Sequence, residues 1–144
     1  MDDGRGATGI VLFDGMYQKP DKHIPQGNII FQALWERYGG GDRSVKVYYG
    51  VESLETTVRL FRGCRYFISL QDSLETAMLF MPAGGSVIEV KPWDTDGIDL
   101  FSSVANAIGL NHYAQPTTTP QMGPVYVDMA AFLTRVFYLI DNHL

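Results

Sequence analysis

Cysteine is almost absent from this chain, and so are long apolar runs. The 144 residues include one cysteine, Cys64, which excludes an internal disulfide and argues against a cysteine-based zinc site. Because Cys64 comes just before an apolar run, we expect it to be a small buried residue. No apolar run reaches the ~20 residues that a membrane-spanning helix needs, so we expect no membrane segment in this chain. The first residues, MDDGRGATG, lack the basic and apolar parts of a signal peptide.

Clusters of basic residues are missing as well. The formal net charge of -5 and the isoelectric point near 5.0 argue against binding to nucleic acid or to an anionic membrane surface. The composition, with 46% apolar and 19% charged residues, is that of an ordinary globular protein. A chain of 144 residues is long enough for one domain with its own core.

Several common catalytic and nucleotide-binding motifs are also absent. No GxGxxG follows the first apolar run, and there is neither a Walker A loop nor a GxSxG elbow. None of the three histidines, His23, His112 and His143, stands at metal-ligand spacing, and we interpret each as a lone surface residue. The DxD triplet at 94–96 falls in an expected turn. We therefore expect no cofactor and no metal.

The pattern that is present alternates short apolar runs with amphipathic stretches. It predicts strands at 10–13, 44–49, 65–70 and 86–90, with an edge strand at 111–114. It predicts helices at 29–38, 52–61, 71–81, 100–108 and 127–142. This order indicates an α/β fold, a Rossmann-like parallel sheet of about five strands with helices on both faces. Residues 1–9 are expected to be a flexible lead, and 10–144 a single domain.

Cap residues and apolar faces refine three of these helices. Asn28 and Ser53 are expected to cap the first two helices. The second helix is expected to turn Leu54, Val58 and Phe61 to one side. The last helix carries a longer apolar stripe, which we consider as a surface for a second copy or a second domain. This stripe comprises Met129, Phe132, Leu133, Val136, Phe137 and Ile140.

The stretch from Cys64 to Pro92 organises the rest of the chain. It predicts a strand, a short helix, a loop and a second strand, which together form a right-handed βαβ unit. Open parallel sheets bind ligands at the carboxyl ends of their strands. The candidate site therefore comprises residues 69–73 and 89–94.

The same stretch resembles the donor-side, C-terminal domain of glycosyltransferase family 61, which includes plant xylan arabinosyl- and xylosyltransferases and animal protein O-linked N-acetylglucosaminyltransferases. That family carries a run of the form LF…A…(I/V)xxxHGAxLxNxLFxPxGxxVIExxP. The matching letters here are LFR at 60–62, FIS at 67–69, MLFMP at 78–82, Gly84 and VIEVKP at 87–92. Weaker similarity at 22–28 and 101–113 extends the match to about residues 10–140.

This resemblance implies one half of a GT-B glycosyltransferase that binds a nucleotide sugar, with UDP as its expected nucleotide. The acceptor, a glycan or a protein, and the catalytic base would come from a second domain. In a eukaryote the resemblance would place the protein in the secretory pathway; the sequence itself gives no compartment. No metal motif is required in such a family.

Nine residues are candidates for substrate binding. Glu89 would accept a hydrogen bond from a ribose or sugar hydroxyl; the alternatives are a salt bridge with Lys91 or a helix cap. Tyr49 and Trp93 could stack on a base or sugar; the alternative for both is ordinary packing. Lys22 and His23 could reach a phosphate, or they could be solvated loop charges. Gln71 could contact a sugar or phosphate, or it could bond to local backbone. The complete set is Lys22, His23, Tyr49, Gln71, Asp72, Ser73, Glu89, Lys91 and Trp93.

The sequence departs from the family where the diphosphate would bind. Gln71-Asp72-Ser73 replaces His-Gly-Ala, and Asp14-Gly15 stands where the family usually has an arginine. A glycine at a helix start lets backbone N–H groups approach a phosphate, whereas Asp72 places a carboxylate there. With Glu75, it has the spacing of a capping box, which would satisfy those N–H groups internally. The sequence therefore leaves two functions open: a glycosyltransferase-like domain, and a non-catalytic carbohydrate- or protein-binding module on the same scaffold.

Overall fold

The computed structural model describes residues 7–13, 27–41, 43–69, 76–91, 100–116 and 129–144. They form a five-stranded parallel sheet with the spatial order β2-β1-β3-β4-β5. The strands are β1 (Gly9–Phe13), β2 (Val45–Tyr48), β3 (Cys64–Ser69), β4 (Ser86–Lys91) and β5 (Asn111–Pro116). The helices are α1 (Gly27–Tyr38), α2 (Leu54–Arg62), the 3-10 helix η2 (Thr76–Phe80), α3 (Leu100–Ala107) and α4 (Met129–Asp141).

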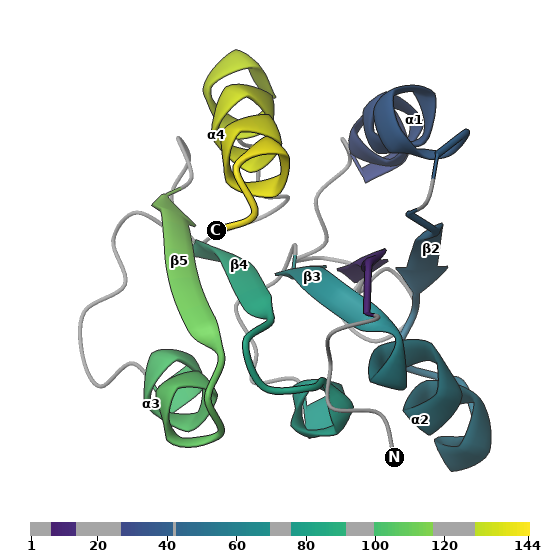
Figure 1. The fold of residues 1–144 in the computed structure, drawn as a ribbon, viewed down its shortest axis with the longest axis vertical. Helices are drawn as coiled ribbons and strands as arrows, with labels where there is room; N and C mark the ends of the chain where they lie inside the picture. The colour runs from purple at the N-terminus through teal and green to yellow at the C-terminus, as the bar shows by residue number, and fades with distance from the viewer. Residues whose placement is uncertain (1–6, 14–26, 42, 70–75, 92–99, 117–128) are drawn as a thin grey trace, which may run out of the picture.

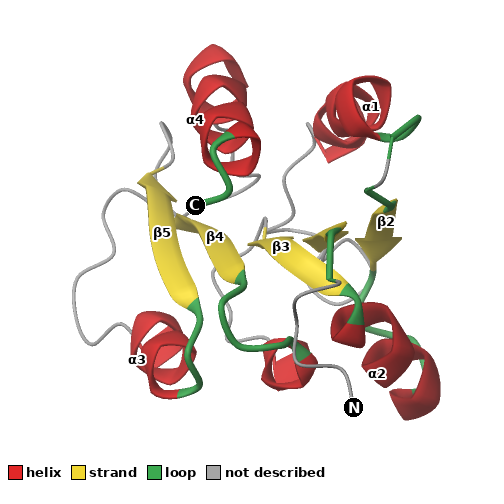
Figure 2. Cartoon of the chain, viewed as in Figure 1, coloured by secondary structure: helices red, strands yellow, loops and turns green. Residues whose placement is uncertain are grey.

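Helices cover both faces of the sheet. Helices α1 and α4 lie on one face, and α2, η2 and α3 lie on the other (Figures 1 and 2). The predicted fold class, a Rossmann-like parallel sheet of about five strands with helices on both faces, is therefore confirmed.

The inner strand β1 shows why the sequence folds this way. All five of its residues are buried, because β2 and β3 flank it and helices cover both of its faces. Successive side chains of a strand point to opposite faces. Ile10 and Leu12 accordingly join one apolar cluster, and Val11 and Phe13 join the other. A strand buried on both sides needs an unbroken apolar run, which is what GIVLF supplies.

Each face of the sheet has its own core. The first cluster contains Ile30 and Leu34 of α1 with Phe132, Val136 and Ile140 of α4. The apolar stripe of the last helix therefore packs against its own sheet, with Met129, Leu133 and Phe137 partly buried beside the three buried residues, rather than forming a separate docking surface. A helix that follows all five strands covers the face that α1 leaves open, so the stripe has no need of a second chain.

The second core is centred on aromatic rings. Phe61 of α2 packs edge-on against Tyr48, with ring centroids 5.0 Å apart, and against Phe67, with centroids 4.9 Å apart. Cys64 is buried in this cluster, as predicted, and burial raises the pKa of its thiol. Met78 of η2 and Ala105 of α3 complete the same layer.

The first turns of α1 and α2 each differ from the prediction in one respect. Ser53 caps α2 as expected, since its side chain accepts a hydrogen bond from the Thr56 N–H. Leu54 was expected on the apolar side of this helix. It is 70% exposed instead, because it lies in the first turn, before the buried Thr57 and Phe61. Helix α1 begins at Gly27, which places Asn28 inside its first turn.

The third predicted helix, at 71–81, is described only at its end. Residues 76–80 form a 3-10 helix rather than an α-helix, and the N–H of Met81 closes a tight turn onto the carbonyl of Met78. Pro82 follows directly and cannot donate a hydrogen bond that would continue the helix. Residues 71–75 lie outside the described part of the chain.

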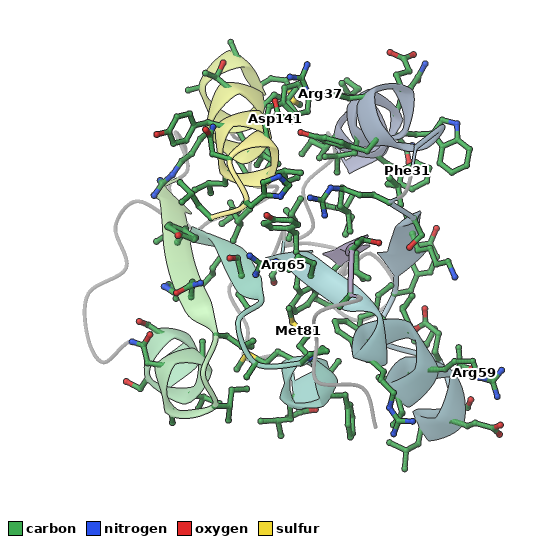
Figure 3. The ribbon with its side chains drawn as sticks, in the orientation of Figure 1. Phe31, Arg37, Arg59, Arg65, Met81 and Asp141 are labelled. Carbon is green, nitrogen blue, oxygen red and sulfur yellow. The ribbon has the colours of Figure 1, made fainter. Side chains whose placement is uncertain are left out.

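A polar joint connects α1 to α4 beside the first core. Asp141 accepts hydrogen bonds from Arg37, at 2.5 Å, and from the hydroxyl of Tyr38, at 2.8 Å (Figure 3). The Arg37 guanidinium lowers the pKa of Asp141, and the Tyr38 hydroxyl adds to this effect. Burial, followed by the hydrogen bond to Asp141, raises the pKa of Tyr38 to about 12.

The end of α4 is tied to the amino ends of β3 and β4. The N–H groups of Leu144 and His143 donate to the carbonyls of Leu139 and Ile140, a Schellman pattern, with His143 at a φ of 56°. Arg65 donates to the carbonyls of Gly84 and His143. Ser86 Oγ donates to the Leu144 carbonyl. Among the described helices, none is both long and apolar enough to cross a bilayer.

The aromatic core gives a direct stability prediction. Replacing Phe61 by Ala should lower the free energy of unfolding by about 3–5 kcal/mol, because the fully buried ring leaves a cavity between Tyr48 and Phe67. The matched control is Leu54→Ala in the same helix, which should change it by less than ~0.5 kcal/mol because Leu54 is 70% exposed. Urea denaturation measures both, and equal losses from the two variants would contradict this core.

The α1–α4 joint predicts a pH dependence. A lowered carboxyl pKa in the folded state stabilises the fold above the ordinary pKa, and this contribution is lost as pH falls through the folded value. Asp141→Asn should therefore be less stable than the unaltered chain at pH 5–7, and the gap should close on acidification below about 3.8. Urea midpoints between pH 2 and pH 7 measure this gap; a gap that does not change with pH would rule out the carboxylate as its source.

Candidate functional site

The order of the strands locates the edge at which a ligand is expected. The chain passes from β1 to β2 on one side and then to β3 on the other side of β1. Open parallel sheets bind ligands outside the carboxyl ends of their strands, at such a switch point. The strand order therefore favours a ligand at the carboxyl ends of β1 and β3. The sequence had instead placed the candidate site at the carboxyl ends of β3 and β4. The two locations share Ser69, the last residue of β3.

The strand register defines a step at this edge. Phe13, Ser69, Glu89 and Ala114 are register partners in one row across β1, β3, β4 and β5. Strands β1 and β3 end at this row, whereas β4 and β5 continue for two more residues, to Lys91 and Pro116. Glu89 therefore lies level with the ends of β1 and β3.

Ser69 and Glu89 lie on the same face of the sheet. Side chains alternate along a strand, so Ser69 shares the face of Phe67, and Glu89 shares the face of Val87. Both of these apolar residues belong to the core under α2, η2 and α3. Ser69 and Glu89 are nevertheless polar and buried, at 0% and 2% exposure.

A buried hydrogen-bonded pair of polar side chains is the main feature of this edge. Nε2 of His112, on β5, lies 2.9 Å from Oε1 of Glu89, and the side chains are only 8% and 3% exposed. His112 is the register partner of Val87, so it contacts Glu89 diagonally across β4 and β5. An ionised carboxylate only accepts hydrogen bonds, so His112 Nε2 carries the proton and donates it. A carboxylate without such a donor would be costly to bury.

The pair corrects the interpretation of His112 as a lone surface histidine. The side chain of His112 is only 8% exposed and is bonded to Glu89, a partner that neither alternative proposed for Glu89 had included. The sequence did mark 111–114 as a strand, but a diagonal contact requires the register between two strands, which a single sequence does not provide. His143, in contrast, is exposed as expected, although its Nδ1 lies 3.2 Å from a guanidinium nitrogen of Arg43.

Tyr49 is the other predicted site residue that the structure describes, and it is not near Glu89. It follows β2, and its backbone N–H donates to Glu52 Oε2 at 3.0 Å. Strands are spaced ~4.8 Å apart, so β2 lies roughly 14 Å from β4, with β1 and β3 between them. Beside it, Lys46, Glu52 and Arg59 line a hollow between β2 and α2 that includes neither Glu89 nor His112.

The remaining predicted site residues lie outside the described part of the chain. They are Lys22, His23, Gln71, Asp72, Ser73 and Trp93, together with the side chain of Lys91. Their roles stay predictions. Within the described ranges, no group of three or more histidine, cysteine, aspartate or glutamate side chains is arranged to hold a metal ion; the DxD triplet at 94–96 falls outside those ranges.

No family model matches this chain, and no curated protein matches it. The fold and the Glu89–His112 pair are therefore the observations from which a function can be proposed.

The buried pair makes a stability prediction of its own. His112→Phe should lower the free energy of unfolding by about 1–3 kcal/mol, because it leaves the Glu89 carboxylate buried without its donor. The double variant Glu89→Leu/His112→Phe should lose less than the sum of the two single variants, with a coupling of ~0.5–3 kcal/mol.

The exposed pair Glu55–Arg59 on α2 is the matched control for this cycle. Its atoms are 2.7 Å apart, but the side chains are 82% and 76% exposed, so its coupling should be only ~0.3–0.5 kcal/mol. Urea denaturation of both cycles measures the difference. A coupling for Glu89 and His112 no larger than that of the exposed pair would show that the buried contact does not form.

Proposed function

We propose that this chain is a glycosyltransferase-like domain that binds a nucleotide sugar at the carboxyl edge of its sheet and contributes to glycosyl transfer. The observation that carries the proposal is the buried Glu89 carboxylate, level with the ends of β1 and β3 and hydrogen-bonded by His112. Glu89 also lies in the block at 79–92 that matches LFxPxGxxVIExxP, which is the specific part of the resemblance to family 61.

The chemistry of the pair supports a ligand that carries hydroxyl groups. A carboxylate accepts hydrogen bonds and repels anions, so it suits the hydroxyls of a ribose or sugar better than a phosphate. In dinucleotide-binding folds an acidic residue near a strand end makes this contact with the ribose. The diphosphate would then lie nearer the switch point, outside the ends of β1 and β3, where the sequence continues into 14–26 and 70–75.

The proposal assigns this domain the donor side of the reaction only. Its partners are a nucleotide sugar, with UDP as the expected nucleotide, and a second domain that brings the glycan or protein acceptor and the base. The described residues contribute one acidic group, Glu89, which is held by His112 and would bind and orient the donor.

A second function is favoured by how closed the Glu89–His112 pair is. The two side chains satisfy each other at 3% and 8% exposure, which also fits a scaffold that kept its structure after losing its ligand. The chain would then be a carbohydrate- or protein-binding module without transfer activity. The replacement of His-Gly-Ala by Gln71-Asp72-Ser73 points the same way.

Calorimetric titration of the purified chain with UDP and several UDP-sugars tests the proposal. We expect saturable binding in the micromolar range and a matching rise in melting temperature. Glu89→Gln should weaken binding by about tenfold to a hundredfold, because a hydrogen bond to a charged group is lost. The control, Glu55→Gln on the exposed face of α2, should leave the affinity unchanged.

The same titration decides between the two functions. Absence of nucleotide binding at millimolar concentration would overturn the donor-domain proposal. If Asp72→Gly then gains nucleotide binding, the scaffold is a transferase site blocked at one residue. Should that variant also fail to bind while free glycans bind the unaltered chain, the binding module is the better account.

A further inference from the structure

We propose that His112 is the positioning residue of the donor site, fixing the Glu89 carboxylate so that it selects a ribose with its full set of hydroxyls. This inference rests on the proposed function, because it concerns the same edge of the sheet. His112 is assigned no contact with the ligand, and it acts through the 2.9 Å hydrogen bond from its Nε2 to Glu89 Oε1.

The backbone holds both partners of this hydrogen bond in place. Strands β4 and β5 stay in parallel register from Ser86 and Asn111 to Lys91 and Pro116, without an irregularity. His112 and Glu89 lie inside this paired stretch, so their Cα positions are fixed relative to each other. At 8% and 3% exposure, neither side chain has room for alternative rotamers in solvent.

A fixed carboxylate binds a diol differently from a mobile one. A free glutamate side chain loses rotamer freedom when it binds, and this loss weakens the complex. In this structure the freedom is already lost in the folded protein, because His112 holds one oxygen and the sheet holds the backbone. Preorganisation of this kind raises affinity for the ligand whose hydroxyls match the fixed lone pairs. It adds nothing for a ligand that lacks one of those hydroxyls.

The position of the pair in the fold supports this role over general packing. The apolar cluster on this face already includes Val87, Ala105 and Leu110 around β4, β5 and α3. An apolar pair at 89 and 112 would extend that cluster without burying a charge. A hydrogen-bonded polar pair stands there instead, and its Glu89 lies at the row where β1 and β3 end, which is where a ligand is expected.

The test compares UDP with 2′-deoxy-UDP as paired ligands in calorimetric titrations. A residue that only stabilises the fold would change both affinities by the same factor, whereas a positioning residue changes their ratio. We expect the unaltered chain to prefer UDP by about tenfold, equivalent to one hydrogen bond. His112→Phe should bring this ratio close to one, and His112→Gln, which keeps an N–H donor, should restore most of it.

The control is His143→Gln, an exposed histidine at the opposite edge of the sheet, which should leave the ratio unchanged. A ratio preserved in His112→Phe, in a chain that binds UDP, would overturn the positioning role alone. The same holds if His112→Gln behaves like His112→Phe. If the unaltered chain binds neither nucleotide, the proposed function is overturned, and the positioning role with it.

A direct measurement covers the case in which His112→Phe does not fold. The Nε2–H resonance of His112 in the unaltered, ¹⁵N-labelled chain reports the hydrogen bond to Glu89. It should shift with saturation as UDP is added and shift less with 2′-deoxy-UDP, because only the ribose completes the contacts of the carboxylate. A resonance that does not move while UDP binds would overturn the inference.

Discussion

The fold depends on one constraint, that β1 is an inner strand of a parallel sheet and must be covered on both faces. Parallel neighbours require crossover connections, and these place helices on both sides of the sheet. The strand therefore has no polar position, and its alternate residues Ile10 and Val11 begin two separate cores. Both cores are closed by helices from distant parts of the sequence: α1 and α4 on one face, and α2, η2 and α3 on the other.

Against this apolar background, two buried polar residues lie side by side in neighbouring strands. The described buried polar residues include Ser69 and Glu89, which are register partners at the row where β1 and β3 end. Burying a carboxylate is costly unless a donor meets it, and the sheet provides that donor from the next strand. The cost is thus concentrated at the edge where parallel sheets bind ligands, which is why we interpret the pair as part of a site rather than of the core.

The sequence predicted the elements well because apolar periodicity reports burial along one segment at a time. The strands, the Ser53 cap and the buried Cys64 follow from local pattern. What it missed depends on relations between segments. The contact between His112 and Glu89 needs the register of β4 and β5, and the burial of the α4 stripe needs the knowledge that α1 leaves part of one face open. Tyr49 was grouped with Glu89 because both follow strands, whereas the spatial order separates β2 from β4.

The connection between α4 and the start of β3 and β4 has a consequence for how the chain folds. Ile88 and Val90 of β4 belong to a cluster whose cover includes Phe132 and Val136, and the residues after α4 are bonded to Arg65 and Ser86. Contacts between segments so far apart must pay loop-closure entropy before they stabilise anything. During synthesis, all five strands leave the ribosome before the helix that covers this face. Until α4 emerges, the nascent sheet exposes an apolar surface, and that interval is when the chain is most open to aggregation or to capture by a chaperone.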